Sequence, residues 1–142
     1  MVTETGRESG TGERMRARGI TVVATVLTTV AVWAVAALAF GQDDLVVQQP
    51  GQDAMELGAG QVVFFSLVPA LLGWAFLAVL ERFVPARALT VWTVVAAVVL
   101  VLSYLPFVQV EATGGTKVTL ALLHLVVAGV LITGFRRAGR RG

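Results

Sequence analysis

Four long apolar runs, each free of Asp, Glu, Lys and Arg, dominate the pattern of hydrophobic and polar positions. They cover residues 20–40, 61–80, 88–107 and 118–135. A helix needs about 20 residues to cross the hydrocarbon core of a bilayer, and each run reaches or approaches that length. The runs are apolar on every face, whereas the strands of a membrane barrel are about 10 residues long and alternate polar with apolar residues. The pattern therefore predicts an all-α polytopic membrane protein with four transmembrane helices in an antiparallel up-down bundle.

The composition of the chain agrees with this prediction. Of its 142 residues, 56% are apolar and only 14% are charged, which is more apolar than an ordinary soluble domain. Cysteine is absent, so disulfides, thiolate metal sites and thiol nucleophiles are excluded. The net charge is +2, but the basic residues flank the apolar runs and do not form a stripe with aromatic residues. We therefore expect no nucleic-acid partner.

The basic residues are distributed unevenly between the segments that flank the runs. The segments on the side of the N-terminus hold all the arginines: Arg7, Arg14, Arg16, Arg18, Arg82, Arg87, Arg136, Arg137, Arg140 and Arg141. Lys117 alone falls on the other side. Because Lys and Arg near the ends of spans resist translocation, we expect both termini in the cytoplasm and the loops at 41–60 and 108–117 outside.

The two ends of the chain differ in composition from the four runs. Residues 1–18 combine Gly, Ser, Thr and charged residues with few apolar ones, a composition that buries too little surface to offset the entropy of ordering. We therefore predict a disordered cytoplasmic tail at 1–18, a four-helix transmembrane domain at 19–137 and a basic cytoplasmic tail at 138–142.

The first run has an alternative interpretation as a cleaved signal peptide. Arginines precede it, and it ends in Ala37-Leu38-Ala39, which resembles a cleavage site. The apolar region of a signal peptide covers about 7–15 residues, and the run at 20–40 is longer. We therefore favour a membrane span.

His124 is the single histidine of the chain, and it lies within the fourth run. Counting depth at about 1.5 Å per helical residue places Ser66, Ser103 and Tyr104 near its level, and these four residues form a candidate polar layer. One interpretation is an outward-facing pocket for a small ligand, ion or proton. The other, which we favour, is hydrogen bonding between packed helices, because polar side chains commonly join membrane helices in this way.

Glu81 and Arg82 form a second candidate, a charged pair at the inner interface. They follow the second run directly. We expect Glu81 to turn toward the bundle and to pair with Arg82, Arg87 or an arginine after the fourth run. The alternative is an exposed pair at the lipid headgroups, which would contribute about 0–1 kcal/mol.

The sequence contains no residue spacing typical of a catalytic, metal or nucleotide site. Zinc sites generally collect three or four protein ligands, and His124 has no carboxylate at its depth. We therefore expect no enzymatic activity, no catalytic, cofactor-binding or metal-binding residues and no cofactor. The expected partners are the lipid bilayer and a second copy of the chain or another membrane protein. For a second copy, the face of the first helix with Thr25, Thr29 and Ala37 offers small residues for close packing.

Several short motifs carry a resemblance to a known family. They are Glu81-Arg82-Phe83 at the end of the second run, Trp92 near the start of the third, Ser103 near its outer end and His124-Leu125-Val126-Val127-Ala128 in the fourth. In these motifs the chain resembles an uncharacterised family of small four-span bacterial integral membrane proteins, classed as a domain of unknown function. The resemblance covers roughly residues 20–137. It implies a four-helix membrane domain and lends no activity, substrate or cofactor.

Together these patterns predict a component of the bacterial cytoplasmic membrane with a structural or partner-associated role. The alternative is a small transporter or ligand-binding membrane protein that uses the polar layer around His124 as an outward-facing pocket. An enzyme acting on a lipid or quinone is the third hypothesis, and it rests only on the general ability of a buried histidine to move protons.

Overall fold

The computed structural model describes residues 2–41 and 46–140, with side chains from residue 10 onward. The elements in chain order are α1 (Val2–Phe40), β1 (Val46–Val47), β2 (Met55–Glu56), α2 (Ala59–Phe83), α3 (Ala88–Ser103), the short 3-10 helix η2 (Leu105–Val108) and α4 (Gly114–Arg140). Four helices in the described part of the chain are long and apolar enough to cross a membrane, with η2 continuing the span of α3. The predicted all-α architecture of four spans is confirmed.

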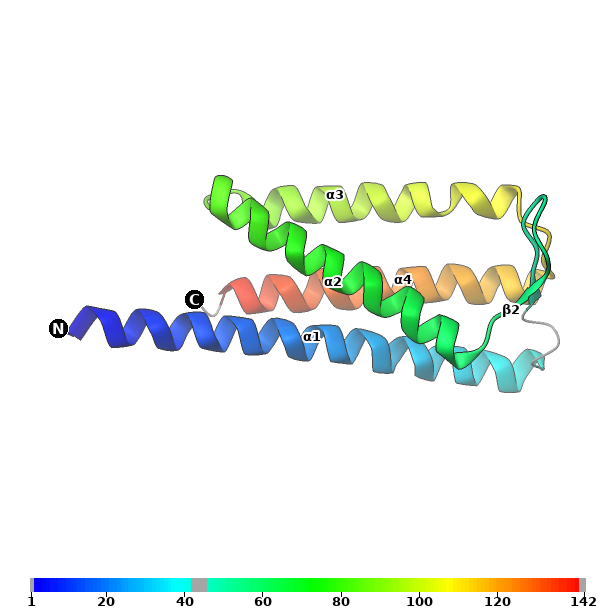
Figure 1. Ribbon diagram of the computed structural model, residues 1–142, viewed down its shortest axis with the longest axis horizontal. Helices are drawn as coiled ribbons and strands as arrows, with labels where there is room; N and C mark the ends of the chain where they lie inside the picture. Colours follow the sequence, from blue (N-terminus) through cyan, green and yellow to red (C-terminus); the bar gives the residue numbers. More distant parts are fainter. Residues whose placement is uncertain (1, 42–45, 141–142) are drawn as a thin grey trace.

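The four long helices form a layer of three with the fourth laid across it. α1, α4 and α3 lie side by side with α4 in the middle, and α2 crosses one face of this layer obliquely (Figure 1). Both ends of the chain and the turn between α2 and α3 lie at one end of the molecule, here called the terminal end. The two-stranded sheet and η2 lie at the other, here called the hairpin end. Each helix is therefore antiparallel to the next in sequence, as the up-down prediction requires.

A small sheet joins the two loops at the hairpin end. Val46 and Val47 of β1 pair antiparallel with Glu56 and Met55 of β2. Directly after β1, the backbone of Gln48 exchanges two hydrogen bonds, of 3.2 and 3.1 Å, with that of Glu111 in the segment after η2. Residues 42–45 of the predicted loop lie outside the described residues. The pairing ties the α1–α2 connection to the α3–α4 connection.

α1 and α4 approach each other closely because small residues line their interface. Thr21, Thr25 and Thr29 of α1 are all buried, and each hydroxyl donates to the carbonyl four residues earlier, at 2.6 to 2.9 Å. The hydroxyls are thus satisfied within α1, and mainly methyl groups remain for packing. Opposite them, a Cβ atom on Gly134 of α4 would overlap Thr21. Close contact of these two backbones therefore depends on glycine at position 134.

The same packing corrects the proposed oligomer face on α1. Thr25, Thr29 and Ala37 are 0%, 2% and 7% exposed within the single chain. This face is consequently occupied by the chain's own helices and is not available to a second copy. Small-residue faces look alike in sequence whether they serve contacts within one chain or between chains.

The main hydrophobic core lies toward the terminal end, where all four helices contribute to it. Its buried members are Val22, Ala70, Leu77, Ala88, Trp92, Leu131 and Phe135. The ring of Trp92 lies 5.2 Å from that of Phe135 between centroids, and its indole N–H donates to the Gly73 carbonyl at 2.8 Å. Trp92 thereby fixes α3 to both α2 and α4.

The predicted disordered tail at 1–18 is wrong over the described residues, because α1 begins at Val2. Composition alone underestimated the helical tendency of this segment, because a helix propagates from an existing span far more easily than it nucleates. Two side-chain contacts also hold it: Arg14 Nε donates to the Gly10 carbonyl at 3.4 Å, and Arg18 pairs with Glu81 of α2. At the other end, α4 continues to Arg140, so most of the predicted 138–142 tail is helical, and residues 141–142 lie outside the described residues.

Candidate functional site

The candidate polar layer is brought together in part, at the hairpin end between α3 and α4. The ring of His124 lies 6.2 Å from that of Tyr104 and 5.2 Å from that of Phe107, which meets it edge-on at 89°. Tyr104 and Phe107 also contact each other, with centroids 5.6 Å apart. These three rings form a compact cluster, here called the aromatic cluster.

Hydrogen bonds fix two members of the aromatic cluster. His124 Nδ1 lies 2.7 Å from the carbonyl oxygen of Leu120, one turn earlier in α4. Because a carbonyl only accepts, Nδ1 carries the proton, and Nε2 of a neutral ring is an acceptor. The Tyr104 hydroxyl donates to the Ala121 carbonyl at 3.1 Å and so joins the end of α3 to α4. The arrangement stabilises the hairpin end of the α3–α4 pair.

The two serines of the predicted layer bond within their own helices. Ser66 is buried and donates to the Val63 carbonyl of α2 at 3.1 Å. Ser103 donates to the Leu100 carbonyl of α3 at 2.6 Å. This local bonding is common for serine in membrane helices. The structure thus brings Tyr104 and His124 together, while the hydroxyls of Ser66 and Ser103 donate within their own helices.

Glu81 turns into the bundle as expected, but its partner is Arg18 of α1. Arg18 Nη1 donates to Glu81 Oε2 at 2.9 Å, and Nη2 donates to Oε1. The Arg18 side chain is 4% exposed and that of Glu81 33%. Arg82 is exposed. The bidentate pair therefore links α1 to α2 near the terminal end, in place of the predicted Glu81–Arg82 pair.

One atom of this ion pair is left without a partner. Arg18 Nε is buried and makes no hydrogen bond in the part of the chain that the structure describes. Burying an ion pair has a large desolvation cost, which good geometry offsets only in part. Glu81 is partly exposed at the terminal end, which lowers that cost because part of the carboxylate stays solvated.

Sequence reasoning missed Arg18 and Phe107 as members of these two clusters. Arg18 carried a usable signal, because it lies three and seven residues before Thr21 and Thr25 and so continues their buried face of α1. Phe107 follows Pro106 in η2. Helical periodicity gives no orientation for its ring, because the chain changes from α to 3-10 geometry there.

Residues suited to metal binding do not gather in the described part of the chain. No group of three or more His, Asp or Glu side chains lies together among those residues. The described polar contacts gather instead in two places: the Arg18–Glu81 pair toward the terminal end and the aromatic cluster with His124 at the hairpin end.

Comparison with known proteins places the chain in a family. A family model described as a family of unknown function (DUF6069) matches residues 9–141. No curated protein and no solved structure matches the chain. The match covers the whole four-helix domain and most of the N-terminal part of α1, in agreement with the resemblance seen in the short motifs. The chain therefore belongs to this family of unknown function, DUF6069.

Proposed function

We propose that the protein is a structural, partner-associated component of the bacterial cytoplasmic membrane, with both termini in the cytoplasm and no catalytic role. One observation carries the structural part of the proposal. The four polar side chains of the candidate layer hydrogen-bond to backbone carbonyls of the same bundle: Ser66, Ser103 and His124 to their own helices, and Tyr104 across to α4. Such bonds stabilise helix packing and leave these groups engaged with the protein itself.

The distribution of charge supports the proposed orientation. The described arginines lie in the N-terminal half of α1, in the last turn of α2, directly before α3 and in the last turns of α4. All these segments lie toward the terminal end, where both ends of the chain are (Figure 1). Lys117 lies at the hairpin end, in the first turns of α4. Segments rich in Lys and Arg stay in the cytoplasm during insertion. The hairpin end then faces outward.

The exposed surface of α3 is where we place the proposed association with a partner. Only 6% of the most apolar part of this span is buried, against 28% for α1 and α4 and 22% for α2. Such a surface contacts lipid or the helix of another membrane protein. A photo-cross-linker placed at the exposed Val98 should yield a product of defined mass with a protein, and the same group at the buried Thr25 should not. Cross-linking to lipid alone from Val98 would contradict association through α3.

The absence of cysteine allows a direct test of the structural role and the orientation. Single cysteines at Asp53, Ser66, Ser103 and His124 are exposed to a membrane-impermeant maleimide added to intact cells. We expect labelling at position 53, in the exposed loop, and protection at the three span positions. A cysteine at the exposed Arg136 should react only after permeabilisation. Labelling of Arg136→Cys in intact cells would contradict the orientation.

A second candidate function is binding of a small ligand at the aromatic cluster. The observation that favours it is the grouping of Tyr104, Phe107 and His124 at the proposed outer end, where an imidazole meets two aromatic rings. If these groups line a wet pocket, cysteines at both 103 and 124 should be labelled from outside. That result would favour the small transporter or ligand-binding protein over the structural role.

A further inference from the structure

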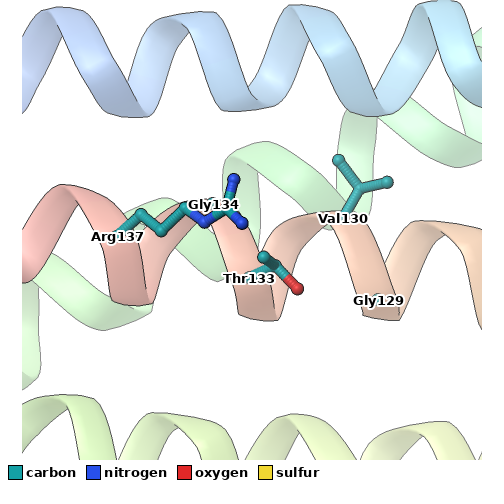
Figure 2. A pocket seen from close by; sticks show the side chains of 5 residues that line it. All are labelled: Gly129, Val130, Thr133, Gly134 and Arg137. Carbon is teal, nitrogen blue, oxygen red and sulfur yellow. The ribbon is translucent and has the colours of Figure 1, made fainter.

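One face of α4 is left open by the arrangement of the helices. α4 lies between α1 and α3, and α2 crosses the layer on one face only (Figure 1). Seen from the opposite side, α4 runs between α1 and α3 with α2 behind it (Figure 2). The exposed positions of α4 follow helical spacing along this side: Val118, Leu122, Leu125, Gly129, Thr133 and Arg137.

The open face changes character along its length. From the hairpin end it carries the large side chains of Val118, Leu122 and Leu125, which are 46–55% exposed. Toward the terminal end the side chains on this face become smaller, with glycine and threonine in place of valine and leucine. The loss of side-chain volume leaves an open groove of about 460 Å³, lined by Gly129, Val130, Thr133, Gly134 and Arg137, a size within the range of about 300–1,000 Å³ that is usual for ligand sites.

The two glycines that line the groove show where it is bounded and where it is open. At Gly134 a Cβ atom would overlap Thr21, so α1 borders the groove closely at that level. At Gly129 a Cβ atom would meet nothing within 4 Å, so the space above it is free. The Thr133 hydroxyl points away from Gly134 and Arg137 (Figure 2). The surface between these residues is therefore largely apolar.

Arg137 closes the groove at the terminal end with a positive charge. Its side chain runs along α4, and the guanidinium lies beside Gly134 (Figure 2). It is eight residues, or about 12 Å along the helix, from Gly129. Within the described residues the single ion pair is that of Arg18 with Glu81, so the guanidinium of Arg137 is available to an anion.

We propose that this groove binds one anionic phospholipid, with the lipid phosphate at Arg137 and the start of an acyl chain over Gly129. A guanidinium forms paired, charge-assisted hydrogen bonds with phosphate oxygens. Arg137 lies where the apolar span gives way to the arginines at the end of α4, which is the depth of the headgroups, and the neighbouring groove matches the acyl chain that follows. A packed helix in the same place would bury the guanidinium without an anion, which is costly.

Native mass spectrometry of the full-length protein in detergent, titrated with palmitoyl-oleoyl phosphatidylglycerol, tests the proposal. Arg137→Gln and Gly129→Leu should each weaken binding at least fivefold, because the first removes the phosphate contact and the second fills the groove. Arg136→Gln and Val118→Leu are matched controls, since both residues are exposed on α4 and neither lines the groove. They should change the dissociation constant less than twofold, and Arg137→Lys should retain part of the binding.

Several outcomes would overturn the proposal. Equal losses from Arg136→Gln and Arg137→Gln would mean attraction by the general positive charge. Unchanged binding in Gly129→Leu would mean that the acyl chain lies elsewhere. Equal binding of palmitoyl-oleoyl phosphatidylcholine would remove the role of the anionic headgroup, and equal competition by free glycerol phosphate would remove the role of the chain. A dimer that disappears in Gly129→Leu would assign the groove to a second copy.

Discussion

α1 and α3 occupy the two edges of the same layer, and both contact α2 and α4, but they are held by different means. α1 packs against α4 through threonines whose hydroxyls donate within α1 and which contact a glycine of α4. It also forms a bidentate ion pair with α2. α3 buries far less of its surface and is attached mainly by Trp92 near one end and Tyr104 at the other. In a bilayer, where lipid tails are as apolar as the helices, close approach and polar bonds determine association. The apolar middle of α3 therefore adds little to its attachment, although it is strongly hydrophobic.

Removing the carboxylate of the ion pair should produce the largest effect on α1. Glu81→Leu leaves the guanidinium of Arg18 buried without its partner, and breaking a buried pair in this way costs about 3–5 kcal/mol. Because Glu81 is 33% exposed, we expect the lower end, about 3 kcal/mol of unfolding free energy. Unfolding by sodium dodecyl sulfate in mixed micelles, followed by circular dichroism, measures it.

The neighbouring Arg82 supplies the control for this experiment. Its side chain is exposed, so Arg82→Leu should change the unfolding free energy by less than about 0.5 kcal/mol. The double variant Arg18→Met, Glu81→Leu should recover most of the stability, because no buried charge remains. Equal losses from Glu81→Leu and Arg82→Leu would show that the ion pair does not hold α1.

A methyl group at Gly134 should loosen the α1–α4 interface next most strongly. The added Cβ of Gly134→Ala overlaps Thr21, and overpacking of this kind costs about 1–3 kcal/mol. Gly129→Ala is the matched control on the same helix, because its Cβ meets nothing within 4 Å. Both variants are measured by the same unfolding assay. Because alanine favours a helix more than glycine does, propensity should stabilise both variants equally. Equal losses of stability in the two variants would therefore contradict a special role for close approach to α1.

The contrast between the two edge helices also separates what the sequence predicted from what it did not. Hydropathy gave the number of spans and their approximate bounds, because crossing a bilayer imposes a minimum length and polarity on each helix. Helical periodicity led to the expectation that Glu81 faces the bundle, because Glu81 lies near the stripe of Gly73 and Leu77 on α2. The partner, Arg18, was placed in a disordered tail, since average composition does not register that a helix extends from a span into polar sequence.

Similar limits apply to the helix faces and to the candidate layer. The threonine face of α1 was assigned to a second copy, because a face of small residues carries no information on whether its partner lies in the same chain. Depth counting grouped Tyr104 with His124 correctly, but it also included Ser66 and Ser103, which bond to their own helices. Axial depth says nothing about the direction in which a side chain points around a helix.

Trp92→Phe should weaken α3 by a smaller amount. The substitution keeps an aromatic ring against Phe135 and removes the hydrogen bond from the indole N–H to the Gly73 carbonyl, which is worth about 0.5–1.5 kcal/mol. Val98→Ala, in the exposed middle of α3, should have almost no effect. A larger loss from Val98→Ala than from Trp92→Phe would mean that the apolar middle of α3 is packed against a partner in the preparation.

His124→Gln should have the smallest effect, because the His124 Nδ1 bond lies within α4 and the helical backbone survives its loss. Polar interactions in membrane bundles average about 0.6 kcal/mol, and we expect His124→Gln to lose less than that and His124→Leu to lose about that much. The unfolding assay used for the other variants measures both. Tyr104→Phe, which removes the bond from α3 to the Ala121 carbonyl, is the informative comparison. If His124→Leu destabilised more than Tyr104→Phe, the imidazole would be making a bond between helices in the micelle. The hairpin end of α3 would then be held by His124, just as its terminal end is held by Trp92.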